Sequence, residues 1–149
     1  MLWVKTFFGI LFQTALLGVF LYLPALTLNW ADALLFLSIH FLITILASAY
    51  LLIVKPASIE ARMNYDSEAQ PKEDRLATVL MLSAIVIGLS LAPIDIFHLN
   101  LSSTFEGNIK NIGLGFYFIG MLLFMASMNA NEFAETTVNI QEERGQKVI

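Results

Sequence analysis

Four long apolar runs dominate this sequence and constrain its fold more than any other feature. A helix needs about 20 apolar residues to cross the hydrocarbon core of a bilayer, and a spanning helix satisfies its backbone hydrogen bonds internally. The runs therefore predict an all-α membrane protein with four transmembrane helices in residues 1–128, followed by a polar, partly helical tail in residues 129–149. The expected spans cover residues 6–28, 31–54, 76–97 and 112–128, and flanking residues should extend the short fourth span.

The composition agrees with a membrane protein and excludes several kinds of chemistry. Only 13% of the residues are charged and 58% are hydrophobic, whereas soluble domains carry about 25% charged residues. The net charge of −4 gives no basic surface for nucleic acid, so the expected partner is the lipid bilayer. The chain has no cysteine, which removes disulfides, thiolate nucleophiles, iron–sulfur clusters and cysteine-based zinc sites.

The first run has a second interpretation, as a cleaved signal peptide. Lys5 precedes it, and Ala31-Asp32-Ala33 after it fits a small-residue cleavage pattern. The apolar region of a signal peptide is only about 7–15 residues long. The length of residues 6–28 therefore favours a retained span.

The distribution of Lys and Arg between the loops predicts the orientation of the chain. Short cytoplasmic loops carry an excess of these residues, while Asp and Glu contribute little. Four spans place both termini and the loop 55–75 on one side, which holds seven of the eight basic residues. We therefore expect both termini in the cytoplasm. The seven are Lys5, Lys55, Arg62, Lys72, Arg75, Arg144 and Lys147, and Lys110 stands alone on the other side.

Polar residues inside the apolar runs are candidate sites, because burying them in a membrane is costly. We expect Gln13 to bond a neighbouring helix. His40 could relay protons or contact a ligand, although a neutral histidine bonded to a backbone carbonyl or a nearby hydroxyl is favoured. Asp95 follows Pro93, which disturbs the helix, and it could cap the next turn or form a structural pair with His98 three residues later.

The sequence contains no pattern that names a reaction by itself. The two histidines lie far apart on different expected elements, so a histidine-based metal site is not expected, and no set of nucleophile, base and orienting residue is recognisable. Ala84, Gly88 and Ala92 recur at a spacing of four, which lets another helix approach closely. We expect this seam to pack within the chain rather than to form a homodimer.

The polar tail resembles a segment of the isoprenylcysteine carboxyl methyltransferase family, in its bacterial membrane members. There, Asn-x-Phe follows a span, and Val-x-Ile-Gln, an acidic pair, Arg-Gly and a later valine come next. Pro24, Ala25 and Trp30 are similar to the family's entry into the second span, and Asp95 with Phe97 is similar to its segment after the third. The matching tail positions are Asn131, Phe133, Val138, Ile140, Gln141, Glu143, Arg144, Gly145 and Val148.

The sequence departs from the family's pattern at two places, both of which concern the part of the protein expected to contact the substrate. Leu26 stands where the family often has glycine, and Ile96-Phe97-His98 lacks an arginine that many members carry near the aspartate. The matches otherwise run in the family's order over nearly the whole chain, and the tail is the most specific of them.

The resemblance implies the membrane-embedded part of a methyltransferase that uses S-adenosylmethionine and acts on a lipophilic acceptor in the bacterial inner membrane. In the family, this tail leads into Gly-Pro-Tyr and Arg-His-Pro, further spans and a late acidic pair, which bind most of the cofactor. These parts have no matching positions here, so we assign no catalytic or cofactor-binding residues and expect an N-terminal half that is inactive and binds no cofactor alone. The alternatives are a stand-alone four-helix binding or regulatory protein and a small transporter subunit, although the lack of paired intramembrane charges counts against proton coupling.

Overall fold

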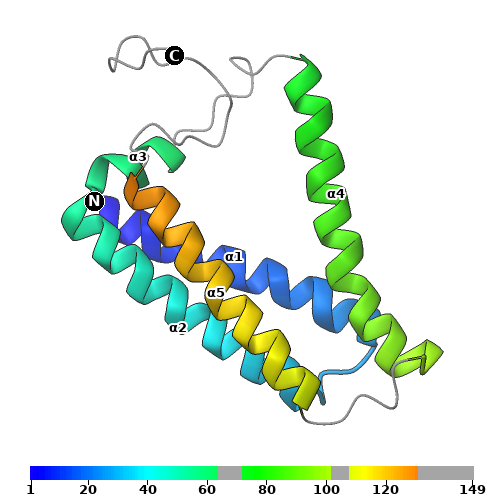
Figure 1. The fold of residues 1–149 in the computed structure, drawn as a ribbon. Coiled ribbons are helices and arrows are strands. Elements are labelled where there is room, and N and C mark those ends of the chain that lie inside the picture. Colours follow the sequence, from blue (N-terminus) through cyan, green and yellow to red (C-terminus); the bar gives the residue numbers. More distant parts are fainter. Residues whose placement is uncertain (64–71, 102–107, 131–149) are drawn as a thin grey trace.

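The computed structural model describes residues 1–63, 72–101 and 108–130, and within them all regular structure is helical (Figure 1). Four of the helices are long and apolar enough to cross a membrane. The tail positions expected to match the methyltransferase family, from Asn131 to Val148, lie outside the described residues. The elements are α1 (Leu2–Ala25), α2 (Ala31–Val54), α3 (Pro56–Met63), α4 (Lys72–Ile94), the π-helix η1 (Asp95–Leu99) and α5 (Asn108–Ala130).

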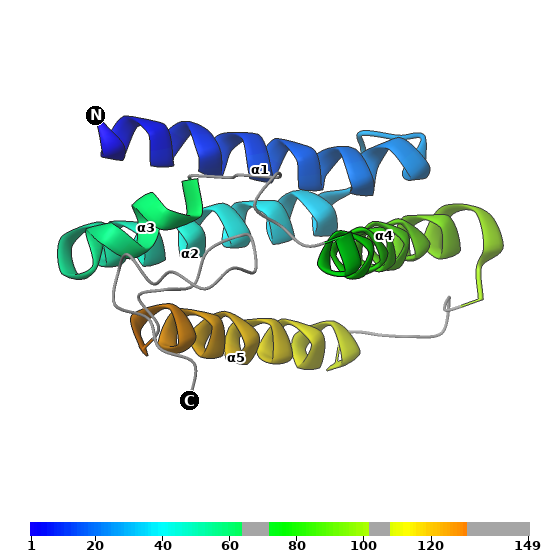
Figure 2. The same ribbon diagram turned by 90° about the horizontal axis from the view of Figure 1, so that it is seen from above.

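Three long helices run along a common direction, and the fourth crosses them. Figure 2 shows α1, α2 and α5 side by side, whereas α4 is seen nearly end-on. In Figure 1, α4 begins away from the other helices and meets α1 only near the end of α1. The expected four spans are therefore present, but three of them form the bundle and α4 packs against one side of one end.

The small core of the bundle lies at the end that holds the N-terminus. Leu2 of α1 packs there against the buried residues Leu51, Leu52, Ile59 and Met128 from α2, α3 and α5. Figure 1 shows the N-terminus, α3 and the last turn of α5 together at this end, which we call the N-terminal end. Its counterpart, where α1 leads into α2, is called the opposite end.

The boundary of the first span differs from the prediction, because α1 ends at Ala25 and Leu28 lies outside it. Leu26 adopts the left-handed conformation, with φ 53°, and its backbone N–H donates to the carbonyl of Leu23. Helices commonly end in this way, usually with glycine at that position. The apolar run continues through Leu28, so hydropathy gives no sign that the helix ends at Ala25.

The loop 55–75 also contains helical structure that the apolar pattern did not predict. Helix α3 occupies Pro56–Met63, beginning with a proline, which suits the first turn of a helix. Its Ser58 and Ile59 are buried. The α3 segment therefore folds back onto the bundle instead of serving only as a connection between spans.

The ends of the other spans follow the predictions more closely. The second span is α2 without any change of boundary, and α5 extends the fourth span at both ends, as expected. Helix α4 begins at Lys72, before the expected third span, and ends at Ile94, where η1 begins. The apolar stretch that could cross a membrane runs from Arg75 to Leu99, through α4 and the change to η1. Pro93 stands just before this change, which confirms the prediction that proline disturbs the helix there.

Most apolar side chains of the spans face outward, as expected for helices in contact with lipid. The seam of Ala84, Gly88 and Ala92 is also exposed, and a Cβ atom added at Gly88 would meet no atom within 4 Å. The expectation that this seam packs within the chain is therefore wrong for the described residues. The reason is the angle of α4, which keeps the middle of that helix away from the bundle (Figure 1).

Candidate functional site

The turn between α1 and α2 and the π-helix η1 meet at the opposite end of the bundle. The rings of Trp30 and Phe97 lie edge to face with their centroids 5.3 Å apart. Nε2 of His98 lies 2.7 Å from the carbonyl oxygen of Pro24, so its N–H donates to that acceptor. Tyr22 adds a hydrogen bond of 3.2 Å from its hydroxyl to the carbonyl of Trp30. Together these contacts fix the turn between α1 and α2 against η1.

Asp95 caps the turn that follows η1. Its Oδ1 accepts a hydrogen bond of 2.8 Å from the backbone N–H of Leu101, and its carbonyl accepts one of 2.7 Å from Asn100. Asn100 has a φ of 54°, which asparagine tolerates better than most residues. Capping was one of the two roles expected for Asp95. The alternative, a structural pair with His98, is not what the geometry shows, because His98 bonds Pro24 instead.

His40 lies inside the bundle and is bonded to α5. Its Nδ1 lies 2.7 Å from the hydroxyl oxygen of Tyr117, and the Phe36 ring packs against both residues. The side chain is buried, with a relative exposure of 8%. The expected contact of a packed histidine with a neighbouring hydroxyl is therefore present, but Nε2 is buried without a hydrogen-bond partner.

A cavity of about 480 Å³ lies between α1, α2, α3 and α5, and His40 is part of its wall. The wall combines apolar side chains with Gln13, Thr44, Ser48 and Arg62. Pockets for small molecules in proteins share this size and this mixture of apolar surface with a few polar groups. Its other lining residues are Thr6, Gly9, Ile10, Ile59, Met63, Met121, Phe124 and Met128.

Arg62 of α3 brings a positive charge to this cavity. Its guanidinium carbon lies 5.3 Å from the centre of the Phe124 ring, an arrangement that favours a cation. Its Nε is buried without a hydrogen-bond partner, and no ion pair with Arg62 is found among the residues that the structure describes. Burial lowers the pKa of this guanidinium, because removal from water disfavours the charged form.

Gln13 is exposed at the cavity, and the described structure shows no hydrogen bond from its amide to another helix. The expected cross-helix bond is therefore missing from this part of the chain. The hydroxyl of Thr44 bonds the carbonyl of His40, four residues earlier, and that of Thr6 bonds the carbonyl of Leu2. The threonines thus have partners within their own helices, whereas Gln13, His40 and Arg62 retain hydrogen-bonding capacity toward the cavity.

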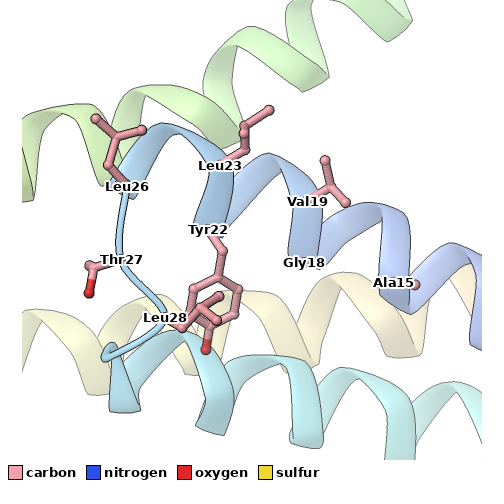
Figure 3. A pocket seen from close by; sticks show the side chains of 8 residues that line it. All are labelled: Ala15, Gly18, Val19, Tyr22, Leu23, Leu26, Thr27 and Leu28. Carbon is pink, nitrogen blue, oxygen red and sulfur yellow. The ribbon is translucent and has the colours of Figure 1, made fainter.

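Two further pockets lie nearer the opposite end. One, of about 570 Å³, is lined by eight residues from α1 and the turn after it (Figure 3). Apart from Tyr22 and Thr27 it offers only apolar side chains, as a lipid-facing groove does. The other, of about 540 Å³, contains Asp32 and Lys110, and these pair with each other over 2.5 Å, so their charges are already compensated.

Sequence reasoning found His40 and Gln13 as candidates but missed Arg62 and Tyr117. The distribution of charge along the chain presents Arg62 only as a loop residue. The proline at position 56, which suits the first turn of a helix, is the signal for the helix that carries Arg62. The described residues contain no group of three or more His, Cys, Asp or Glu side chains that could hold a metal ion. Searches of family models, of curated proteins and of solved structures found no match to the chain.

Proposed function

We propose that the chain forms the membrane-embedded part of a methyltransferase that uses S-adenosylmethionine and resembles the isoprenylcysteine carboxyl methyltransferase family. The observation that carries the proposal is the segment from Asn131 to Val148, whose matched residues follow the family's order. Helix α5 ends at Ala130, so this segment begins immediately after a helix whose Met128 lines the cavity.

The arrangement at the opposite end is consistent with this proposal. The resemblance joins Pro24, Ala25 and Trp30 with Asp95 and Phe97, which are distant in sequence. In the fold, Trp30 contacts Phe97 and Pro24 accepts a hydrogen bond from His98. A shared structural role of these two segments would explain why both occur in one family pattern.

The proposed orientation places the N-terminal end of the bundle at the cytoplasmic face of a bacterial inner membrane. The excess of Lys and Arg in the segments expected on that side supports it. The cofactor is water-soluble, so methyl transfer to a membrane-bound acceptor would take place near this face. The acceptor would be a lipophilic molecule with a nucleophilic group, which takes the methyl group while S-adenosylhomocysteine leaves.

A methyl-transfer assay tests the proposal. Membranes containing the product of the gene's whole reading frame should transfer tritium from methyl-labelled S-adenosylmethionine to a prenylcysteine carboxylate, as an ester that base hydrolyses. The purified 149-residue chain should neither transfer methyl nor bind the cofactor tightly. Transfer by this chain alone, or no transfer by the whole reading frame with any lipophilic carboxylate, would contradict the proposal.

Matched variants sharpen the assay. Glu143→Gln changes a residue of the family pattern and should lower methyl transfer by about tenfold or more, the effect of losing roughly 1.4 kcal/mol of stabilisation in the transition state. Glu135→Gln makes the same chemical change in the same tail, at a position outside the pattern, and should leave the rate within about twofold. Equal losses in both variants would indicate that the pattern carries no special role.

A stand-alone membrane binding protein is the second candidate. The observation that favours it is the cavity, because the residues that line it include two with buried polar atoms lacking partners. This candidate would be supported if the protein encoded by the whole reading frame binds a lipophilic ligand but transfers no methyl group.

A further inference from the structure

The cavity between α1, α2, α3 and α5 holds two unsatisfied polar atoms at different depths. Arg62 lies over Phe124, which is six residues before the end of α5, or about 9 Å along the helix axis. His40 bonds Tyr117, seven residues further from that end and therefore about 10 Å deeper. A single molecule that lies along the cavity could reach both.

The chemistry of the two atoms defines what such a molecule must offer. Arginine stays protonated in proteins, and a half-buried charge without a partner is costly, so an anionic group is its natural complement. At His40, the phenol of Tyr117 can donate to Nδ1, which leaves Nε2 of the neutral ring carrying the proton. The deeper position then requires a hydrogen-bond acceptor without a charge, such as a carbonyl oxygen.

The remaining wall is suited to a hydrocarbon chain. Ile10, Ile59, Met121 and Met128 line the cavity, and methionine adapts to chains of different shape. The lining residues Gly9, Gln13 and Phe124 are exposed, so the cavity reaches the outer surface between α1 and α5. In a membrane that surface faces lipid, and a ligand can enter sideways from the bilayer.

We propose that this cavity binds an anionic phospholipid of the surrounding bilayer, with its phosphate at Arg62, an acyl ester carbonyl at Nε2 of His40 and one acyl chain among the apolar residues. A phosphate and the neighbouring ester carbonyl supply an anion followed by a neutral acceptor, which is the order of groups that the cavity requires. Arg62 presents a planar fork of N–H donors that matches phosphate oxygens. The site depends on these two residues and not on the proposed methyl transfer.

Lipid binding to the purified 149-residue chain tests the inference, in detergent and without S-adenosylmethionine. Native mass spectrometry should show one retained phosphatidylglycerol, and titration with lysophosphatidylglycerol should give a saturable affinity. Arg62→Gln should weaken that affinity about tenfold or more, which corresponds to roughly 1.4 kcal/mol. Lys5→Gln removes the same charge from an exposed position outside the cavity and should leave the affinity within about twofold.

The role of His40 is tested with a matched pair of lipids. The wild-type chain should prefer the ester-linked lysophosphatidylglycerol over its ether-linked analogue, which lacks the carbonyl, and His40→Phe should abolish this preference. The comparison in the wild type needs no variant, so it stays informative if His40→Phe does not fold. Circular dichroism checks the helix content of every variant.

Several outcomes would overturn the inference. Equal affinities of the wild type and Arg62→Gln would show that the arginine does not bind the lipid. Equal affinities of ester and ether lipids for the wild type would show the same for the histidine. Competition by inorganic phosphate at the same concentration as the lipid would show a site for free anions only. Because no methyl transfer is measured, failure here leaves the proposed function untouched, and failure of methyl transfer leaves the lipid site untouched.

Discussion

The hydroxyl of Tyr117 on α5 lies 2.7 Å from Nδ1 of His40 on α2, which joins two helices across 77 residues of sequence. Phe36 packs against both rings, so the pair sits in an aromatic cluster. This hydrogen bond attaches α5 to the α1–α2 hairpin in the middle of the bundle.

Tyr117→Phe should therefore loosen α5 without changing its ring packing. Hydrogen bonds between membrane helices contribute about 0.6 kcal/mol on average and up to about 1.7 kcal/mol, and we expect a loss of unfolding free energy in this range. Unfolding in mixed micelles of SDS and a mild detergent measures it. Tyr50→Phe is the control, since Tyr50 is 45% exposed. An equal loss of unfolding free energy in Tyr50→Phe would show that removal of any tyrosine hydroxyl has this effect, and that the bond to His40 adds nothing.

Leu26→Gly should stabilise the protein. Leu26 has a φ of 53°, a conformation that costs a side chain roughly 1 kcal/mol and glycine almost nothing, and its side chain is 79% exposed, so little packing is lost. We expect a gain of about 0.5–1 kcal/mol in the same unfolding assay. Leu28→Gly makes the same change where φ is not positive and should give no gain. Destabilisation by Leu26→Gly would show that the side chain matters more than the backbone.

Asp95→Ala should destabilise the turn after η1, because Oδ1 of Asp95 accepts the N–H of Leu101. Loss of this hydrogen bond should cost about 1 kcal/mol, whereas Asp95→Asn keeps an acceptor oxygen and should retain most of the stability. Hydrogen exchange of the Leu101 amide offers a local measurement. Equal exchange in the wild type and Asp95→Ala would contradict the capping role.

Gly88→Ala should be tolerated and slightly stabilising. Nothing lies within 4 Å of a Cβ added at Gly88, and glycine inside a helix is unfavourable relative to alanine by about 0.5–1 kcal/mol. Thermal unfolding in detergent, with Ser83→Ala as a neighbouring exposed control, measures the change. A clear loss of stability at Gly88 alone would mean that another helix approaches α4 closely there.

Single-cysteine labelling should confirm the proposed orientation, and the absence of natural cysteine makes the background clean. Lys5→Cys and Lys55→Cys should react with a membrane-impermeable maleimide only after the cells are permeabilised, so that the reagent reaches the cytoplasmic side. Lys110→Cys should react in intact cells from the other side. The reverse pattern would invert the topology, and reaction of Lys5→Cys and Lys110→Cys from one side would contradict four complete spans.

Several features of the site depend on contacts that no local sequence pattern encodes. Asp95 could be predicted to cap a turn, because Pro93 disturbs the preceding helix and the acceptor lies close in sequence. That His98 bonds the carbonyl of Pro24 rather than Asp95 could not be predicted, because Pro24 lies 74 residues away in the sequence. The same limit applies to the contact of Trp30 with Phe97.

Hydropathy was enough to predict the fold class, the number of spans and the boundaries of α2, because the hydrophobic effect and backbone hydrogen bonding act on every long apolar segment in the same way. The apolar pattern also placed His40 within the second span and left a backbone carbonyl or a nearby hydroxyl as its expected partner. Three features became visible only once the helices were packed: the partner of His40 is the hydroxyl of Tyr117, α3 carries Arg62 over Phe124 to the cavity, and α4 turns its small-residue seam outward. These features arise from the angles at which helices pack and from where their backbones end, and hydropathy carries no information about either.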